Sequence, residues 1–105
     1  MIIKKVLVPE RVRSTGKSFC FISHRFLTDG FLQSLSWHEL ALYIFLVLAS
    51  DKDGISFYGD KTISSILGLK EADYAFAKSC LIHKDLIVHD GTLFQVLSLP
   101  MHVNS

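Results

Sequence analysis

Cysteine and proline are scarce in this sequence, and neither sign of charge is in clear excess. Each of the two residues occurs twice among 105 residues, and the net charge is only +1. Two cysteines, Cys20 and Cys80, are too few for a disulfide framework, which argues against a small secreted disulfide-rich scaffold. A net charge near zero also means that any nucleic-acid binding must come from local clusters of basic residues.

Long apolar runs are absent as well. The longest, from Leu40 to Ala49, is about half of the roughly twenty residues that a membrane-spanning helix needs. The first nine residues contain no apolar stretch long enough for a signal peptide. The sequence therefore predicts a cytoplasmic protein that does not contact a membrane.

Apolar residues are nevertheless abundant. They make up 50% of the chain, and eight Phe, three Tyr and one Trp are among them. A chain of this length corresponds to one domain and can bury enough surface to fold without metal or disulfides. We expect Trp37, Tyr43 and Phe45 to be core residues.

The N-terminal part combines apolar and basic residues. Residues 1–8 are rich in Ile and Val and predict a short strand that ends at Pro9. Residues 10–18 carry turn formers and basic side chains, which is typical of a loop or a flexible basic arm. Residues 19–22 (Phe-Cys-Phe-Ile) form a second candidate strand.

Helical signals begin further along. Apolar residues at helical spacing in 24–35 predict two short helical turns, with a break at Gly30. Ser36 and Glu39 have the spacing of a capping box, which predicts a helix from there to about Ser50. Because this helix is apolar on every side, we expect it to be buried at the centre of the protein.

Two further helices are predicted. A turn at 51–54 leads into residues 55–58, which are either a very short strand or an extended connector. Asp60 is placed to cap a helix over 61–67, and Gly68 is a suitable left-handed stop.

The C-terminal third predicts a longer helix followed by a hairpin. The helix spans about residues 70–84. Asp90-Gly91 separates two apolar runs within 86–97, which is a strong short-range hairpin signal. Residues 100–105 are expected to be a frayed tail. The predicted fold class is α+β and mainly helical, with additional N-terminal strands.

This order of elements resembles that of the winged helix-turn-helix domains of plasmid and phage replication initiators and related transcription regulators. The resemblance implies a winged helix-turn-helix domain over 19–99, which the N-terminal strand and basic arm over 1–18 precede and the tail over 100–105 follows. The matching segments are Leu35–Tyr43, Asp53-Gly54, Tyr58–Asp60, Ile63–Leu69, Leu81 and Leu86-Ile87.

In such domains the third helix of the motif enters the major groove of double-stranded DNA. The resemblance therefore implies DNA binding in transcription regulation or in replication of a mobile element. The expected DNA contacts are all basic residues: Lys61, Lys70 and Lys78 around the third helix, and Arg11, Arg13 and Lys17 in the arm.

The charge distribution supports DNA binding by the basic arm more than by the third helix. Residues 1–30 contain six basic and two acidic side chains, whereas 55–87 contain four of each. The basic segment could follow DNA phosphates, or it could be an ordinary solvated loop. Both interpretations remain open from the sequence.

The third helix has a second interpretation. Tyr74, Ala77 and Leu81 have core spacing, and the opposite face carries no Arg, Asn or Gln. That face either is covered by the N-terminal strands or contacts a protein, as in a homodimerisation or adaptor module. The expected interface residues are Ala72, Ala75, Phe76 and Ser79.

Catalytic and metal-binding patterns are weak. Cys80, His83 and His89 do not complete a four-ligand zinc pattern, and Asp51 and Asp53 lack the other ligands of a calcium loop. The glycines are scattered singly, so no phosphate-binding loop is indicated. We expect no enzymatic activity, no cofactor and no metal site.

Overall fold

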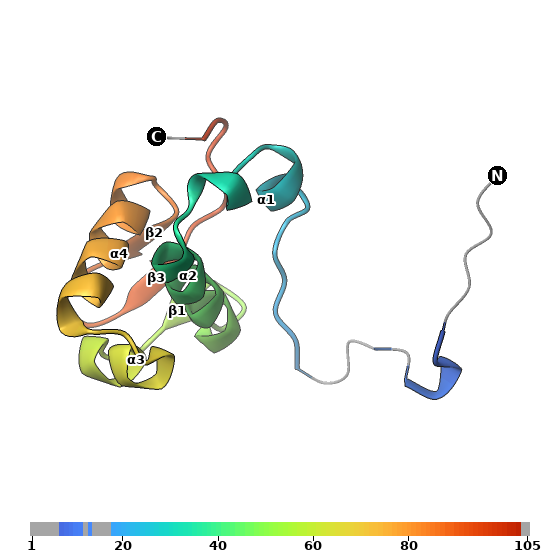
Figure 1. Cartoon of the computed structure of the whole chain (residues 1–105), viewed down its shortest axis with the longest axis horizontal. Coiled ribbons are helices and arrows are strands. Elements are labelled where there is room, and N and C mark those ends of the chain that lie inside the picture. Colours follow the sequence, from blue (N-terminus) through green and yellow to red (C-terminus); the bar gives the residue numbers. More distant parts are fainter. Residues whose placement is uncertain (1–6, 12, 14–17, 104–105) are drawn as a thin grey trace.

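The computed structural model describes residues 7–11, 13 and 18–103. Within these residues the protein is an α+β fold, as the composition and periodicity predict, with the helices packed over one face of a small sheet (Figure 1). Its α-helices are α1 (Arg25–Thr28), α2 (Trp37–Ala49), α3 (Asp60–Leu67) and α4 (Glu71–His83). Its strands are β1 (Ile55–Ser56), β2 (Ile87–His89) and β3 (Phe94–Val96), and short 3-10 turns lie at Pro9–Arg11 and Leu32–Ser34.

Helix α2 begins at the predicted capping box. The amide of Glu39 donates to the Ser36 Oγ at 3.2 Å, and the Ser36 amide donates to the Glu39 carboxylate at 3.4 Å. Two amides that the helix leaves without a backbone partner are thereby paired. The expected start and end of this helix are confirmed.

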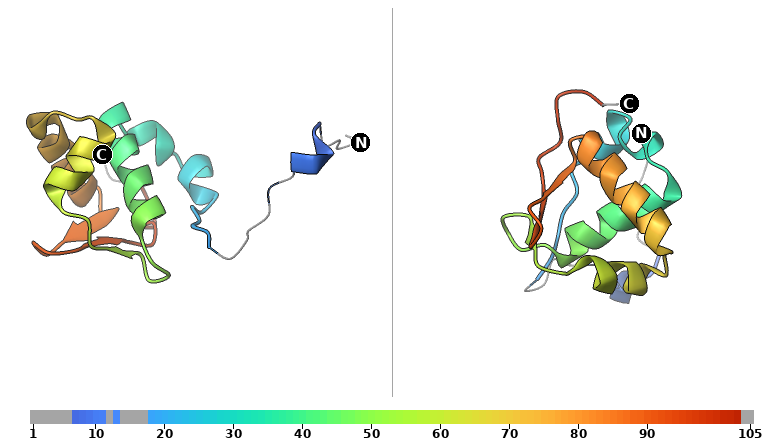
Figure 2. Two further views of the ribbon diagram at one scale, coloured as in Figure 1. Left: turned by 90° about the horizontal axis from the view of Figure 1, so that it is seen from below. Right: turned by 90° about the vertical axis from the view of Figure 1, so that its left-hand side faces the viewer.

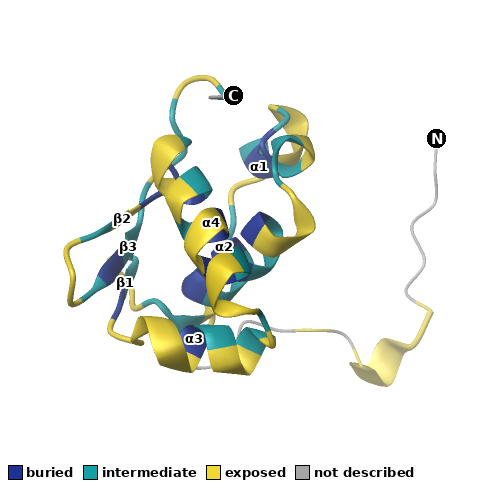
Figure 3. Ribbon diagram, turned by 60° about the vertical axis from the view of Figure 1, so that its left-hand side comes forward, coloured by how far each residue is buried: buried dark blue, intermediate teal, exposed yellow. Residues whose placement is uncertain are grey.

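Helix α2 also supplies the centre of the core, as predicted. Leu42 and Leu46 are completely buried, and Tyr43 is buried against the ring of Phe26. The buried residues form a stripe along the helix that faces the interior (Figure 3). The prediction that Trp37 is a core residue is wrong, because it lies off this stripe and is 83% exposed.

The three strands form an antiparallel sheet with β3 in the middle, in the order β1-β3-β2. Phe94 of β3 pairs with Ser56 on one side and with His89 on the other. The chain can approach β3 closely at Gly54, where φ is +83° and an added Cβ would lie 2.7 Å from the Val96 carbonyl oxygen. Only glycine fits this position without displacing the backbone.

The hairpin β2–β3 forms where Asp90-Gly91 predicts it. The Asp90 carboxylate accepts from the amides of Thr92 and Leu93, both at 2.8 Å, and the Asp90 amide donates to the Leu93 carbonyl. Gly91 takes a positive φ of 95°. The aspartate thus closes the turn through its own side chain.

Helix α3 differs from the prediction at its start. Asp60 is the first residue of the helix rather than its cap, and Gly59 occupies the cap position. The Asp60 side chain cannot cap because it bonds to Tyr74 and Lys78 of α4 instead. Gly68 ends the helix in the left-handed conformation, as predicted.

The predicted strand over 19–22 is wrong, since this segment is extended but has no strand partner among the residues that the structure describes. Its Phe19 and Phe21 side chains are 68% and 78% exposed. Of the other predicted strand, over 1–8, residues 1–6 lie outside the described residues, and Leu7 and Val8 are not in a strand.

The C-terminal segment is held against the body rather than frayed, at least through Val103. The Arg25 guanidinium donates to the carbonyl oxygens of Pro100 and Met101 at 2.8 and 3.2 Å. Val103 packs against the core cluster. Residues 104 and 105, the rest of the predicted tail, lie outside the described part. No described helix is long and apolar enough to cross a membrane.

An ion pair connects the two longest helices. The Lys84 ammonium, just after α4, lies 2.5 Å from the Glu39 carboxylate of α2 and donates to the Ser34 carbonyl at 2.7 Å. Glu39 is only 7% exposed. Burial opposes ionisation of Glu39, but the hydrogen bonds from Lys84 and Ser36 outweigh it and lower its pKa below the usual value.

We expect Lys84→Met to lower the free energy of unfolding by about 2–3 kcal/mol, because it leaves a buried carboxylate without its cationic partner. Since the pKa of Glu39 is lowered in the folded state, its ionised form stabilises the protein above the unfolded-state pKa, and this contribution is lost as the pH falls through the folded-state value. Glu39→Gln should therefore weaken the decline in stability between about pH 5 and pH 3. Urea denaturation across this range measures both effects; an unaltered pH profile in Glu39→Gln would contradict the assignment.

Candidate functional site on helix α4

Helix α4 has one buried and one exposed face. Tyr74, Ala77 and Leu81 are buried, as their spacing predicts. The exposed face carries Phe76, whose side chain is 63% exposed, together with Glu71, Ala72, Ala75 and Ser79. No segment of the described chain covers this face, so the expectation that N-terminal strands would cover it is not met there. Figure 3 shows the exposed positions along the outer side of the helix.

The lysines expected near α4 are in different environments. Lys61 on α3 and Lys70 at the start of α4 are exposed. Lys78 is half-buried, because its ammonium lies 3.2 Å from the Asp60 carboxylate and 5.4 Å from the centre of the Phe94 ring. Lys61 and Lys70 can bind an anion without losing a described contact, whereas Lys78 already has a carboxylate partner.

Asp60 links α3 to α4. Its carboxylate accepts from the Tyr74 hydroxyl at 2.5 Å and from the Lys78 ammonium. Burial opposes ionisation of Asp60, but these two hydrogen bonds lower its pKa below the usual value. Burial and the same carboxylate raise the pKa of Tyr74. The hydroxyl therefore stays protonated and keeps donating, which fixes the angle between the two helices.

The basic arm lies away from α4. Arg11 and Arg13 are both exposed, and Lys17, the third arm residue of the prediction, lies outside the described residues. Figures 1 and 2 show the 3-10 turn at Pro9–Arg11 on the far side of the body from α4. The structure does not bring the two groups of expected DNA contacts together.

The hairpin tip is acidic rather than basic. Residues 88–93 contain no lysine or arginine. Hydrogen bonds from the backbone amides of Leu93 and Thr92 lower the pKa of Asp90, so this exposed side chain carries a negative charge at neutral pH. His89 stacks on Phe94 with 4.1 Å between the ring centres. The tip would not attract a phosphate through charge.

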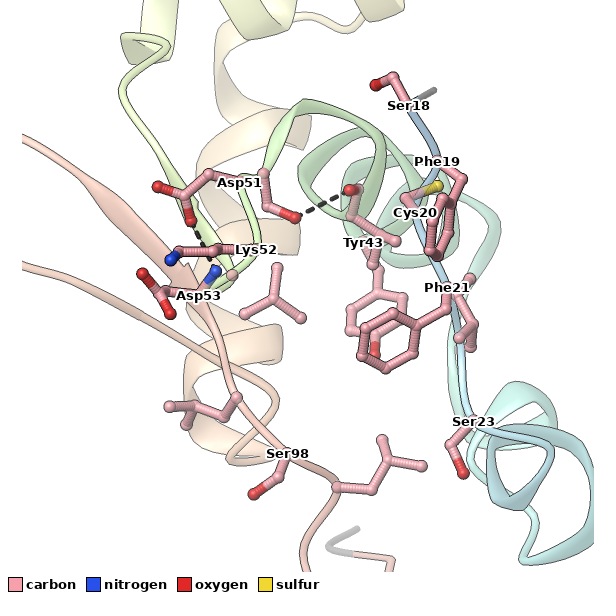
Figure 4. A pocket seen from close by; sticks show the side chains of 17 residues that line it. Ser18, Phe19, Cys20, Phe21, Ser23, Tyr43, Asp51, Lys52, Asp53 and Ser98 are labelled. Carbon is pink, nitrogen blue, oxygen red and sulfur yellow. Dashed lines mark hydrogen bonds between the residues drawn. The ribbon is translucent and has the colours of Figure 1, made fainter. Parts of the chain in front are cut away.

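Sequence reasoning missed a groove elsewhere on the body. A cavity of about 600 Å³ lies between the extended segment 18–23, helix α2 and residues 96–99 that follow β3 (Figure 4). The apolar residues of 19–22 are the sequence signal in this region, and they predict a strand. The cavity instead separates this segment from the sheet.

Among the described residues, no three His, Cys, Asp or Glu side chains gather in a way that could hold a metal ion. Cys20 and Cys80 are free thiols. Comparisons with protein-family models, with curated proteins and with solved structures gave no match. Function must therefore be argued from the residues and their geometry.

We expect Tyr74→Phe to lower the free energy of unfolding by about 1–2 kcal/mol, because it keeps the buried ring but removes a hydrogen bond to a carboxylate. Thermal and urea denaturation measure the change. The control is Tyr58→Phe, which alters a tyrosine that is 45% exposed and should leave stability unchanged. Equal midpoints for Tyr74→Phe and the unaltered protein would show that the hydrogen bond between Tyr74 and Asp60 contributes nothing to stability.

Proposed function

We propose that this protein is a winged helix-turn-helix domain that binds double-stranded DNA in transcription regulation or in the replication of a mobile element. The observation that carries the proposal is the order α2-β1-α3-α4-β2-β3 together with β3 as the central strand. In a winged helix the helix at the position of α4 enters the major groove and the hairpin is the wing.

The charges around α4 favour contacts with phosphates over reading of bases. Lys61 near the start of α3 and Lys70 just before α4 are exposed and supply positive charge. Glu71 and Asp73 in the first turn repel phosphate, and the exposed face carries no Arg, Asn or Gln to read a base edge. Binding is therefore expected to be weakly sequence-specific and strongly dependent on salt.

The arm adds a second basic region. Arg11 and Arg13 are exposed on the opposite side of the body from α4, so one straight duplex would not meet both regions in the arrangement of Figure 2. Simultaneous contact requires the arm to fold towards α4 or the DNA to bend. We expect the arm to raise affinity without adding specificity.

The test is fluorescence anisotropy with a pool of randomised duplexes at low salt. The double variant Lys61→Glu/Lys70→Glu should weaken binding by about tenfold or more and reduce the slope of affinity against salt by about two, because two phosphate contacts are lost. Arg11→Glu/Arg13→Glu should weaken binding by a smaller factor.

The matched control is Lys52→Glu, which changes an exposed lysine in the turn between α2 and β1. After correction for the change in net charge, Lys52→Glu should alter the affinity for DNA by less than about twofold. If the unaltered protein does not bind the duplex pool at micromolar concentration, the proposal fails. Equal losses in all three variants would show a general charge effect and no DNA-binding face.

A second candidate function is a protein contact through α4. The observation that favours it is Phe76, a large aromatic side chain that is 63% exposed between Ala72, Ala75 and Ser79. Aromatic side chains flanked by small residues allow close approach of a partner surface and are common at the centre of interfaces. Such a module would dimerise or act as an adaptor.

The self-association of Phe76→Glu tests this candidate separately from DNA binding. Because Phe76 is exposed, the variant should fold normally, and it should weaken self-association or partner binding by about a hundredfold if Phe76 anchors the contact. Sedimentation velocity of both proteins measures self-association, and Ile66→Glu, at a position that is 57% exposed on α3, is the control. If the unaltered protein and Phe76→Glu are both monomers, a dimer through α4 is ruled out.

A further inference from the structure

The groove beside β3 has walls from four parts of the chain: the extended segment 18–23, helix α2, the turn 50–54 and residues 96–99. Helix α2 contributes Tyr43 and Val47, the extended segment contributes Phe19 and Phe21, and residues 96–99 form the opposite wall. In Figure 4 the Phe21 ring projects from the extended segment into the groove towards Tyr43. Both phenylalanines remain largely exposed, so the groove presents apolar side chains that nothing in the described chain covers.

On both sides of the groove, part of the backbone has no hydrogen-bond partner among the described residues. Residues 19–22 and Ser98 make no backbone hydrogen bond to any described residue. The Val96 amide bonds to Gly54 on the β1 side of the strand, whereas the Leu97 amide bonds to Leu86 on the β2 side. By the alternation of an extended strand, the amide and carbonyl of Ser98 face the groove.

The edge of β3 beside the groove has room for one more strand. Strand β1 contains only Ile55 and Ser56, so it leaves the edge of β3 uncovered beyond Val96. A further extended segment could continue in line with β1 and bond to Ser98 on one side and to residues 19–22 on the other. The apolar walls would cover its side chains.

The N-terminal arm has the properties of such a segment. Leu7 and Val8 are 89% and 46% exposed, and they precede a 3-10 turn that lies far from the body (Figures 1 and 2). Residues 2–8 read Ile-Ile-Lys-Lys-Val-Leu-Val, a composition that favours a strand. The turn at 51–53 that borders the groove carries Asp51, Lys52 and Asp53, a net charge of −1, which is of opposite sign to the two lysines of that segment.

We propose that the groove binds the N-terminal arm of a second copy of this chain, with Leu7 and Val8 seated against Phe21 and Tyr43. Because each copy has one arm and one groove, the exchange is reciprocal and closes into a two-fold dimer. The arm would thereby bury its exposed apolar side chains and pair the free edge of β3. The proposal is independent of DNA binding and does not use the exposed face of α4.

The test is the association of the full chain by sedimentation velocity over a range of concentrations. The unaltered protein should dimerise, and Leu7→Asp and Phe21→Asp should each raise the dissociation constant by about tenfold or more, because each places a charge in an apolar contact. The control is Leu48→Asp, whose position on α2 is 67% exposed but does not border the groove; it should dimerise like the unaltered protein. Phe76→Glu should also leave this dimer intact.

Hydrogen exchange of the Ser98 amide gives a second measurement. The amide should be protected in the dimer and should exchange freely in Leu7→Asp. The Ser98 amide could instead be protected to the same extent at every protein concentration, with Leu7→Asp removing the protection. Each arm would then lie in the groove of its own chain, and the proposed dimer would be wrong. A free Ser98 amide in the unaltered protein, or a dimer that only Phe76→Glu dissociates, would also overturn the proposal.

Discussion

Burial of one stripe of α2 determines the positions of the other elements. Leu42 and Leu46 have no exposed surface, and α2 contacts α3, α4, β1 and β3. Each fully buried leucine stabilises the fold by about 2 kcal/mol through removal of apolar surface from water. The ion pair between Glu39 and Lys84 then fixes the end of α4 relative to α2. The exposed face of α4 is thus presented on a rigid support.

Local chemistry made most of the elements predictable. Ser36 and Glu39 satisfy the first amides of α2, Gly68 takes the left-handed conformation after α3, and Asp90 closes the hairpin through its own carboxylate. Each of these signals acts within three residues along the chain, and each needs no knowledge of the rest of the fold. Such signals located the helices, the turn and the hairpin, and with them the α+β class.

Interactions between distant residues were not predictable in the same way. Asp60 is a residue type that commonly caps helices, but its carboxylate accepts a hydrogen bond from Tyr74, fourteen residues later, instead of from a backbone amide of α3. Trp37 is aromatic, but its angular position on α2 points away from the core stripe. For the candidate site, the sequence identified the second face of α4 but left open whether it is covered, and it did not show that Lys78 bonds to Asp60 or that a groove borders β3.

Gly54 has a consequence for the evolution of this protein. A Cβ at this position would collide with the Val96 carbonyl, and the positive φ already disfavours other residues. Homologous chains that keep the close approach of this turn to β3 must therefore keep glycine there, whatever happens to the surface of α4.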